Sequence, residues 1–92
     1  MAIYYASCHT PDNLDTDRRI QGLGGAGWGW FNIDTIIHMI NVQQHTFYTK
    51  PPFAPGQMII TAIHPRTGRV YLKTVADGAE PNNILSLPHC PR

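Results

Sequence analysis

Isoleucines recur along residues 32–44 with the period of an α-helix. They occupy positions i, i+3, i+4 and i+7, which are Ile33, Ile36, Ile37 and Ile40. This spacing lines one face of a helix, so the sequence predicts a helix over residues 33–43. Either Asn32 or Asp34 can accept a hydrogen bond from a free amide of the first turn.

Strand-like segments lie on both sides of this helix. Residues 2–8, AIYYASC, are rich in aromatic and β-branched types and predict a first strand. Residues 46–50, TFYTK, predict a short strand, and residues 58–74 predict a hairpin whose turn is PRTG. Gly68 can take the left-handed conformation that closes such a turn.

The register of the predicted hairpin decides which side chains share a face. With Pro65 opposite Arg69, the expected core face consists of Ile60, Ala62, Val70 and Leu72. The opposite face then consists of Ile59, Thr61, Ile63, Tyr71 and Lys73. This second face is unusually apolar for a surface in water. We therefore expect it to be covered, either by the C-terminal tail or by another chain.

The C-terminal segment is too apolar for a free tail, because it contains Ile84, Leu85 and Leu87. Pro81 and Pro88 interrupt regular structure on both sides of these residues. A chain of 92 residues with 42% hydrophobic content has room for one core. The sequence thus predicts a single α+β domain over residues 1–92: a small, mainly antiparallel sheet with one helix packed across it and an ordered, irregular C-terminal tail.

Charge and composition narrow the possible partners. Seven Lys and Arg residues against six Asp and Glu residues give a net charge of +1, so no bulk field favours a polyanion. The start of the chain does not resemble a signal sequence, and no segment approaches the ~18 apolar residues of a membrane span. We therefore expect a cytoplasmic protein with no membrane partner. In a reducing cytosol, Cys8 and Cys90 are expected to be free thiols.

Residues 22–30, GLGGAGWGW, contain the GxGxxG spacing at Gly22, Gly24 and Gly27. A dinucleotide site needs an apolar strand before this motif, a helix directly after it and an acidic residue about 20 positions further on. Here polar residues precede the motif, and the later window NVQQHTF has no carboxylate. We interpret the segment as a glycine turn that lets Trp28 or Trp30 fold back onto the core.

Cys8-His9 and His89-Cys90 together offer two thiols and two imidazoles, which is a ligand set for tetrahedral zinc. Adjacent residues on a strand point to opposite faces, however, and paired zinc ligands normally stand two to four residues apart. The four residues could converge only if the chain ends packed side by side. We therefore name Cys8, His9, His89 and Cys90 as metal candidates but predict that no metal or other cofactor is bound.

Acid–base catalysis has candidates but no recognisable constellation. His38, His45 and His64 could act as general bases, with Asp34 or Asp77 as an orienting carboxylate. His38 lies one turn from Asp34, which a solvated pair on a helix surface explains. We assign no catalytic residue, and an enzymatic function is not favoured.

Besides a small zinc-binding domain, which stays an alternative, two kinds of binding function remain open. The hairpin end carries Arg66, Arg69 and Lys73, and the rings available to stack on nucleic-acid bases are Trp28, Trp30, Phe53 and Tyr71. The near-zero net charge counts against nucleic acid, which stays the alternative. The favoured hypothesis is a non-enzymatic protein-interaction module that binds either a second copy or another protein. Its expected surface consists of Ile59, Ile63, Arg66, Arg69, Tyr71 and Lys73.

Three segments carry a likeness to a known family: IYYASC at residues 3–8, IQGLGGAGWGW at residues 20–30 and GRVYLKTVADGAEPNNILSLPHC at residues 68–90. With the short helix between them, they resemble a small bacterial family of domains of unknown function, number 3892. The ending is the most specific part, because it follows that family's Tyr-Leu-x-Thr, Asp-Gly and Leu-Pro-x-Cys elements. The resemblance implies no activity, because the family has none assigned.

Overall fold

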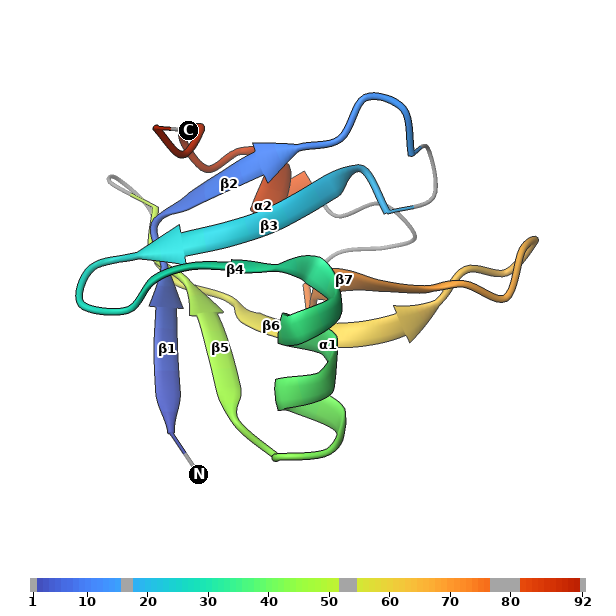
Figure 1. The fold of residues 1–92 in the computed structure, drawn as a ribbon, viewed down its shortest axis with the longest axis horizontal. Helices are drawn as coiled ribbons and strands as arrows, with labels where there is room; N and C mark the ends of the chain where they lie inside the picture. Colours follow the sequence, from blue (N-terminus) through green and yellow to red (C-terminus); the bar gives the residue numbers. More distant parts are fainter. Residues whose placement is uncertain (1, 16–17, 52–54, 77–81, 92) are drawn as a thin grey trace.

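The computed structural model describes residues 2–15, 18–51, 55–76 and 82–91 (Figure 1). The strands are β1 (Ile3–Ala6), β2 (Cys8–Pro11), β3 (Ile20–Gly25), β4 (Gly29–Asn32), β5 (Thr46–Thr49), β6 (Met58–Ile63) and β7 (Val70–Thr74). The helices are α1 (Ile33–Asn41) and α2 (Asn82–Leu85). The predicted first strand is thus two strands, β1 and β2, separated by Ser7 alone.

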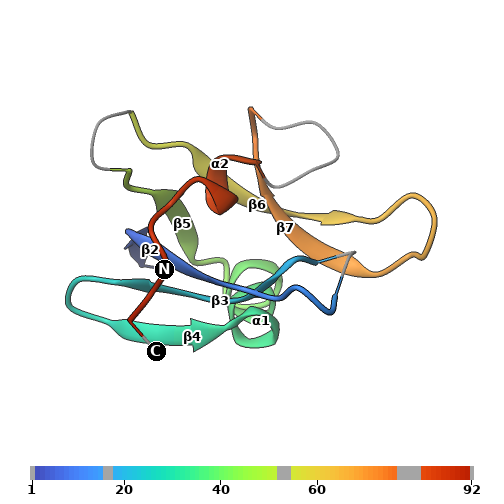
Figure 2. The ribbon, with the colours of Figure 1, turned by 90° about the horizontal axis from the view of Figure 1, so that it is seen from above.

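The strands form two sheets, which Figure 2 shows as separate layers. One sheet has the order β1-β5-β6-β7 and the other has the order β2-β3-β4. Among the pairings between these strands, that of β1 with β5 is parallel and the others are antiparallel. The chain passes from one sheet to the other between β1 and β2 (Figure 1). The fold is therefore α+β and mainly antiparallel, as predicted.

Helix α1 confirms the isoleucine pattern and bridges the two sheets. It contacts β3 and β4 on one side and β6 and β7 on the other. Asn32 caps its first turn, because the Asn32 side chain accepts a hydrogen bond from the Thr35 amide at 2.8 Å. Ile33, Ile36 and Met39 are buried in the core. No helix in the described ranges is long and apolar enough to cross a bilayer.

The β6–β7 hairpin has a different register from the one predicted. Ile63 pairs with Val70, and the His64 amide donates to the Arg69 carbonyl at 2.8 Å. The loop is therefore one residue longer than expected, and this shift exchanges the faces of one strand relative to the other. Ile59 lies in the core together with Leu72, so the predicted core face was wrong.

The opposite face of this hairpin consists of Met58, Ile60, Ala62, Tyr71 and Lys73. The described part of the C-terminal tail packs on the other face of the hairpin. Ile84 and Leu87 are buried in the main core, and Asn83 donates to Thr74 Oγ1 at 2.8 Å, on the same face as Ile59. Helix α2 lies between β7 and β2, so the tail joins the two sheets. The predicted ordered tail is confirmed.

Candidate functional site

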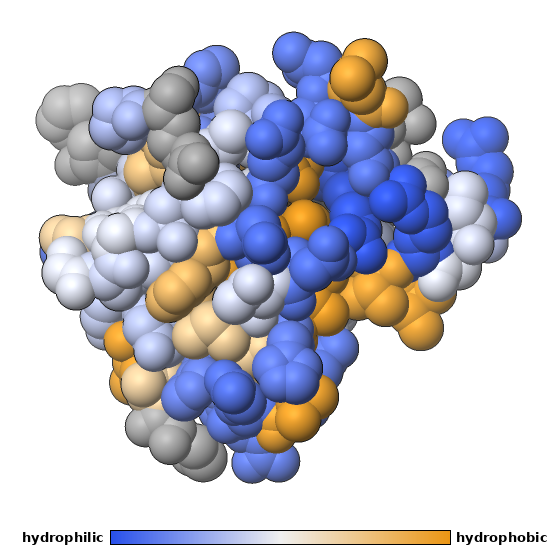
Figure 3. Space-filling view, in the orientation of Figure 1, coloured by the Kyte–Doolittle hydropathy of each residue, from blue (hydrophilic) through white to orange (hydrophobic). Residues whose placement is uncertain are grey.

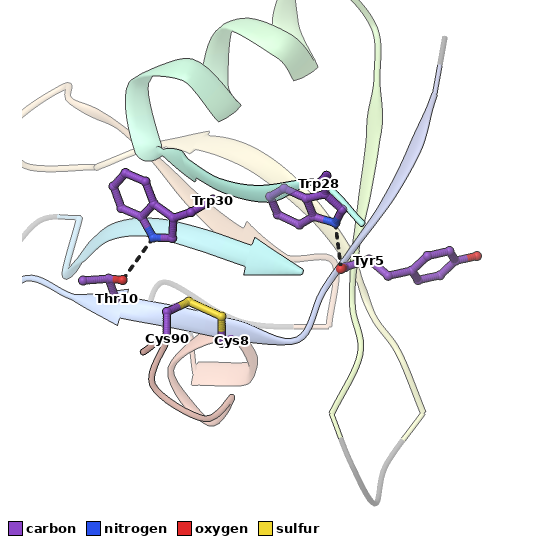
Figure 4. The surroundings of a disulfide bond; sticks show 6 residues. All are labelled: Tyr5, Cys8, Thr10, Trp28, Trp30 and Cys90. Carbon is purple, nitrogen blue, oxygen red and sulfur yellow. Dashed lines mark hydrogen bonds between the residues drawn. A yellow bond between two sulfur atoms is a disulfide. The ribbon is translucent and has the colours of Figure 1, made fainter. Parts of the chain in front are cut away.

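The two chain ends lie side by side and are joined covalently. Cys8 and Cys90 form a disulfide with their Cα atoms 4.9 Å apart (Figure 4). The prediction of free thiols was therefore wrong. It rested on the expected compartment, whereas the geometry follows from backbone pairing, in which the His9 amide donates to the Pro88 carbonyl at 2.9 Å and the Cys90 amide donates to the His9 carbonyl at 2.8 Å.

The same pairing separates the four metal candidates into two faces. His9 and His89 form a parallel β-bridge, and their rings lie 5.1 Å apart between centroids. The two sulfurs lie in the disulfide, which leaves no thiolate to bind zinc. In the described part of the chain, no three His, Cys, Asp or Glu side chains are grouped for a metal. The chain ends do pack together, but alternation along the strand keeps thiols and imidazoles apart.

His9 is the one buried titratable side chain at this junction. It is 1% exposed, and its Nδ1 atom has no hydrogen-bond partner. Burial lowers the pKa of the His9 imidazole below its ordinary value, and a charge on His89 lowers it further, while a hydrogen bond with the Leu87 backbone acts in the opposite direction. His9 is therefore a neutral structural residue at pH 7.

The glycine-rich segment is a β-hairpin, in which a turn at residues 26–28 joins β3 to β4. Gly22, Gly24 and Gly25 lie within β3, where side chains from neighbouring elements occupy the space of a Cβ atom. A Cβ on Gly22 would collide with the Trp30 ring, and one on Gly25 would collide with Trp28. A Cβ on Gly24 would lie 2.8 Å from the Cys8 sulfur. The absence of a side chain at these glycines thus leaves room for the Trp28 and Trp30 rings and for the disulfide.

Trp28 folds back onto the core, as interpreted from the sequence. Its ring stacks on Phe31 at 5.3 Å between centroids and meets the edges of Tyr4 and Phe47. Its Nε1 donates to the Tyr5 carbonyl at 3.2 Å (Figure 4). Trp30 lies elsewhere, over Gly22, and donates to Thr10 Oγ1 at 3.1 Å.

The histidines considered for catalysis do not converge. His45 Nδ1 accepts a hydrogen bond from the Ala2 amide at 2.9 Å, and His64 Nδ1 accepts one from the Arg66 amide at 3.3 Å. Asp34 pairs with Arg18 at 2.7 Å, whereas His38 was the partner considered from the sequence. Asp77 lies outside the described residues.

The residues predicted as an interaction surface do not form one surface. Ile59 is 1% exposed and Tyr71 is 3% exposed, whereas Ile63 is 69% exposed. Arg69 forms a bidentate ion pair with the Asp15 carboxylate, with hydrogen bonds of 2.8 and 2.9 Å. Arg66 is exposed at the hairpin tip and Lys73 is half-buried on the opposite face from Ile63. Phe53 lies outside the described residues.

A groove that the sequence did not predict runs along strand β1. Its volume is about 420 Å³, and its lining consists of Ile3, Tyr5, Ser7, Ala26, Trp28, Lys50 and Pro51. The β3–β4 turn contributes one wall, and the residues that follow β5 contribute another. Strand β1 is the edge strand of its sheet, and Figure 1 shows no strand on its outer side.

Part of the β1 main chain at this groove has no partner. In the parallel ladder, the carbonyls of Ala2 and Ala6 accept from the amides of Thr46 and Lys50 at 2.9 and 2.7 Å. The main-chain groups of the even-numbered residues therefore point toward β5, and those of Ile3 and Tyr5 point toward the outer edge of the sheet. Within the described chain, the Ile3 amide and carbonyl and the Tyr5 amide have no hydrogen-bond partner, while the Tyr5 carbonyl accepts from Trp28.

The family described as "Protein of unknown function (DUF3892)" matches residues 12–88. This chain belongs to the DUF3892 family. No curated protein and no solved structure matches this DUF3892 chain. The match includes the groove walls at Ala26, Trp28, Lys50 and Pro51 and begins after β1. It ends at Pro88, before Cys90.

Sequence reasoning missed this groove because edge position is a property of the sheet. The stretch IYYA gives apolar residues on both faces of β1, so it does not show which face or edge is open. Ile3 is 61% exposed and Tyr5 is 52% exposed, whereas Ala6 is fully buried. The sequence carries no signal for the groove, because the contact that places Lys50 Nζ 5.9 Å from the centre of the Tyr5 ring exists only in the folded chain.

Proposed function

We propose that this DUF3892 chain is a non-enzymatic protein-interaction module that binds its partner along strand β1. The observation that carries the proposal is an edge strand with unpaired main-chain groups beside a groove of about 420 Å³. An exposed edge strand is a template for pairing with another chain. Its exposed apolar side chains, Ile3 and Tyr5, add contact area at the same place.

The distribution of polar side chains supports binding over catalysis. A general base needs a partner and an orienting group within hydrogen-bond reach. The two histidines with hydrogen bonds described above, His45 and His64, both bond to backbone amides, on separate elements. Among the described residues that line the groove, the polar side chains are Tyr5, Ser7 and Lys50, and none is a histidine or a carboxylate.

The charged residues give less support to nucleic-acid binding. Arg69 and Arg18, which could have contacted phosphates, form ion pairs with Asp15 and Asp34.

Figure 3 shows hydrophilic and hydrophobic residues interspersed on one face of the molecule, without a single extended apolar patch. A module of this kind is expected to have a localised binding site.

The proposal is tested with two exposed isoleucines that lie on different elements. Ile3→Asp places a charge at the β1 groove, and Ile63→Asp places the same charge at the β6–β7 hairpin, where the side chain is similarly exposed. Partners are captured from native host cells, identified, purified and titrated against both variants by calorimetry. We expect Ile3→Asp to weaken binding at least ten-fold and Ile63→Asp to leave it within two-fold. The reverse order would place the interface on the hairpin.

A homodimer is one form that this function can take. Light scattering at micromolar concentration measures the mass of the wild-type chain and of Ile3→Asp. A dimer that Ile3→Asp converts to a monomer makes the partner a second copy. A wild-type monomer together with a captured partner makes the module heterotypic, and a monomer with no captured partner contradicts the proposal.

A cytoplasmic location stays a prediction, and the disulfide provides its test. Disulfides are rare in the cytosol because glutathione and thioredoxin keep thiols reduced. Alkylation of intact cells followed by mass spectrometry reports the state of Cys8 and Cys90 in place. Alkylated thiols at both positions are expected for a cytoplasmic protein, and a protected disulfide would indicate an oxidising compartment.

A further inference from the structure

We propose that the groove beside β1 binds an extended peptide, which pairs with the main chain of β1 and places an acidic side chain against Lys50. This inference rests on the proposed function and names the chemistry of the partner. Three features of the described residues carry it: the free main-chain groups of β1, the shape of the groove around them, and the charge of Lys50.

The free main-chain groups have the spacing that an added strand uses. The amide and carbonyl of Ile3 and the amide of Tyr5 point away from β5 on the outer edge of the sheet. Residues two apart on a strand face the same edge, so these groups lie in a row. An extended peptide that joins a sheet edge gains main-chain hydrogen bonds in this way, and side-chain pockets then provide specificity.

The groove favours a single extended segment over the edge of a second copy. The Trp28 indole already donates a hydrogen bond to the Tyr5 carbonyl. Ala26 and Trp28 form one wall of the groove beside the outer edge of β1. Pairing of two β1 strands across a twofold axis would bring the walls of both copies to the same edge. A slender peptide meets one such wall, which can contact its side chains.

The charges around the groove favour an acidic peptide. Lys50 is exposed, and no described carboxylate lies in the groove lining. The described carboxylates have partners elsewhere: Asp34 bonds to Arg18, Asp15 bonds to Arg69, and Asp12 accepts the amides of Leu14 and Asp15. A lysine with no described carboxylate beside it favours a partner that supplies an opposite charge.

The aromatic rings at the groove favour a peptide over single-stranded nucleic acid. Stacking of bases needs free ring faces and several cations along the strand. The Trp28 ring is stacked on Phe31, and the Tyr5 ring lies against Tyr48 at 5.8 Å between centroids. Lys50 is the one cationic side chain among the described residues of the lining.

The two sides of the groove also predict the pattern of the peptide. The Tyr5 side chain points away from Trp28 (Figure 4), toward the face that Lys50 shares. Alternate side chains of an added strand therefore meet Lys50 and Tyr5 on one side and Trp28 and Ala26 on the other. The expected peptide alternates acidic and apolar residues.

The experiment selects seven-residue peptides from a random phage-displayed library on the wild-type chain. The strongest peptide is synthesised with a fluorescein label and titrated by anisotropy against Ile3→Pro, Lys50→Glu and the hairpin control Ile63→Asp. The Ile3 amide faces outward, so proline there removes one donor to the peptide and none to β5.

We expect an alternating acidic and apolar consensus, binding about ten-fold weaker in Ile3→Pro and in Lys50→Glu, and an unchanged affinity in Ile63→Asp. Methylation of alternate amide nitrogens in the peptide should abolish binding. Equal affinity for all three variants would overturn the proposal, as would a basic consensus. Circular dichroism of each variant confirms that it is folded.

The remaining outcomes separate this inference from the proposed function. If no peptide is selected but a purified folded partner still loses affinity for Ile3→Asp, the peptide inference fails and the interaction module stands. If light scattering shows a dimer that Ile3→Pro dissociates, the occupant is a second copy. If the chain binds oligo(dT) in a salt-sensitive way that Lys50→Glu abolishes, the occupant is nucleic acid.

Discussion

The outer edges of β1 and β2 differ in how they are paired, although the two strands follow one another in the chain. The outer edge of β2 is paired with the C-terminal tail through the His9–His89 bridge and is tied by the Cys8–Cys90 disulfide. The outer edge of β1 has no strand beside it and keeps main-chain groups unpaired in the described chain. The fold thus closes one of two successive strand edges and leaves the other without a neighbouring strand in the described chain.

The largest expected loss of stability follows from opening the outer edge of β2. Opening the Cys8–Cys90 bond releases a tail held across a separation of 82 residues. Loss of a native disulfide in a small domain costs about 2–5 kcal/mol. We therefore expect Cys90→Ser to lower the melting temperature by at least about 8 °C, measured by calorimetry. Reductant should destabilise the wild type to the same extent and leave the Cys8→Ser, Cys90→Ser double variant unchanged. A wild type insensitive to reductant would contradict the closure.

The next effect concerns the glycine strand of the same sheet. Gly22→Ala places a methyl group against the Trp30 ring and the Phe31 carbonyl, and overpacking of this kind costs about 1–3 kcal/mol. Gln21→Ala is the matched control, because Gln21 is exposed on the same strand. Urea unfolding followed by tryptophan fluorescence measures both. Equal midpoints for the two variants would show that Trp30 moves aside without cost.

A pH-dependent effect is expected at the junction of β2 with the tail. The pKa of His9 is lowered in the folded state, so below the ordinary value of 6.5 the unfolded chain takes up a proton more readily than the folded one. The free energy of unfolding should therefore fall as the pH drops below about 6.5 and level off once folded His9 is protonated. Urea midpoints between pH 7.5 and 5 measure this slope.

Two variants assign that slope to His9. His9→Leu should flatten it, because the buried titratable group is gone. His38→Gln should retain it, since His38 lies on the exposed face of α1. A slope that persists in His9→Leu would show that another group carries the pH dependence.

The smallest effect is expected at the open edge. Ile3→Pro should change the free energy of unfolding by about 0.5 kcal/mol or less, because the Ile3 amide makes no ladder hydrogen bond. Tyr4→Pro should cost at least about 2 kcal/mol more than Tyr4→Ala, because both lose the ring contacts of Tyr4 while Tyr4→Pro also loses a hydrogen bond to β5 and leaves a carbonyl unpaired. A loss in Ile3→Pro as large as this difference would mean that β1 has no free edge. Urea titration compares them directly.

Local patterns in the chain predicted the helix, the C-terminal packing and the α+β class. Period and capping act over a few residues, so the isoleucine spacing and Asn32 were sufficient for α1. Exposing the apolar side chains of Ile84 and Leu87 to water would cost free energy, so their burial was predicted, and both are buried. The same reasoning was wrong for the β6–β7 faces, because a loop one residue longer exchanges the two sides of a strand and leaves composition unchanged.

Residue type and spacing were enough to predict which segments bury apolar side chains. Which distant groups meet depended on how the strands pair in the folded chain. This pairing joined Cys8 to Cys90 and separated them from the paired histidines, and it placed Trp28 beside the edge of β1. Strand order and register arise from long-range pairing, which leaves no local pattern in either strand. The closed edge and the open groove are both products of that pairing.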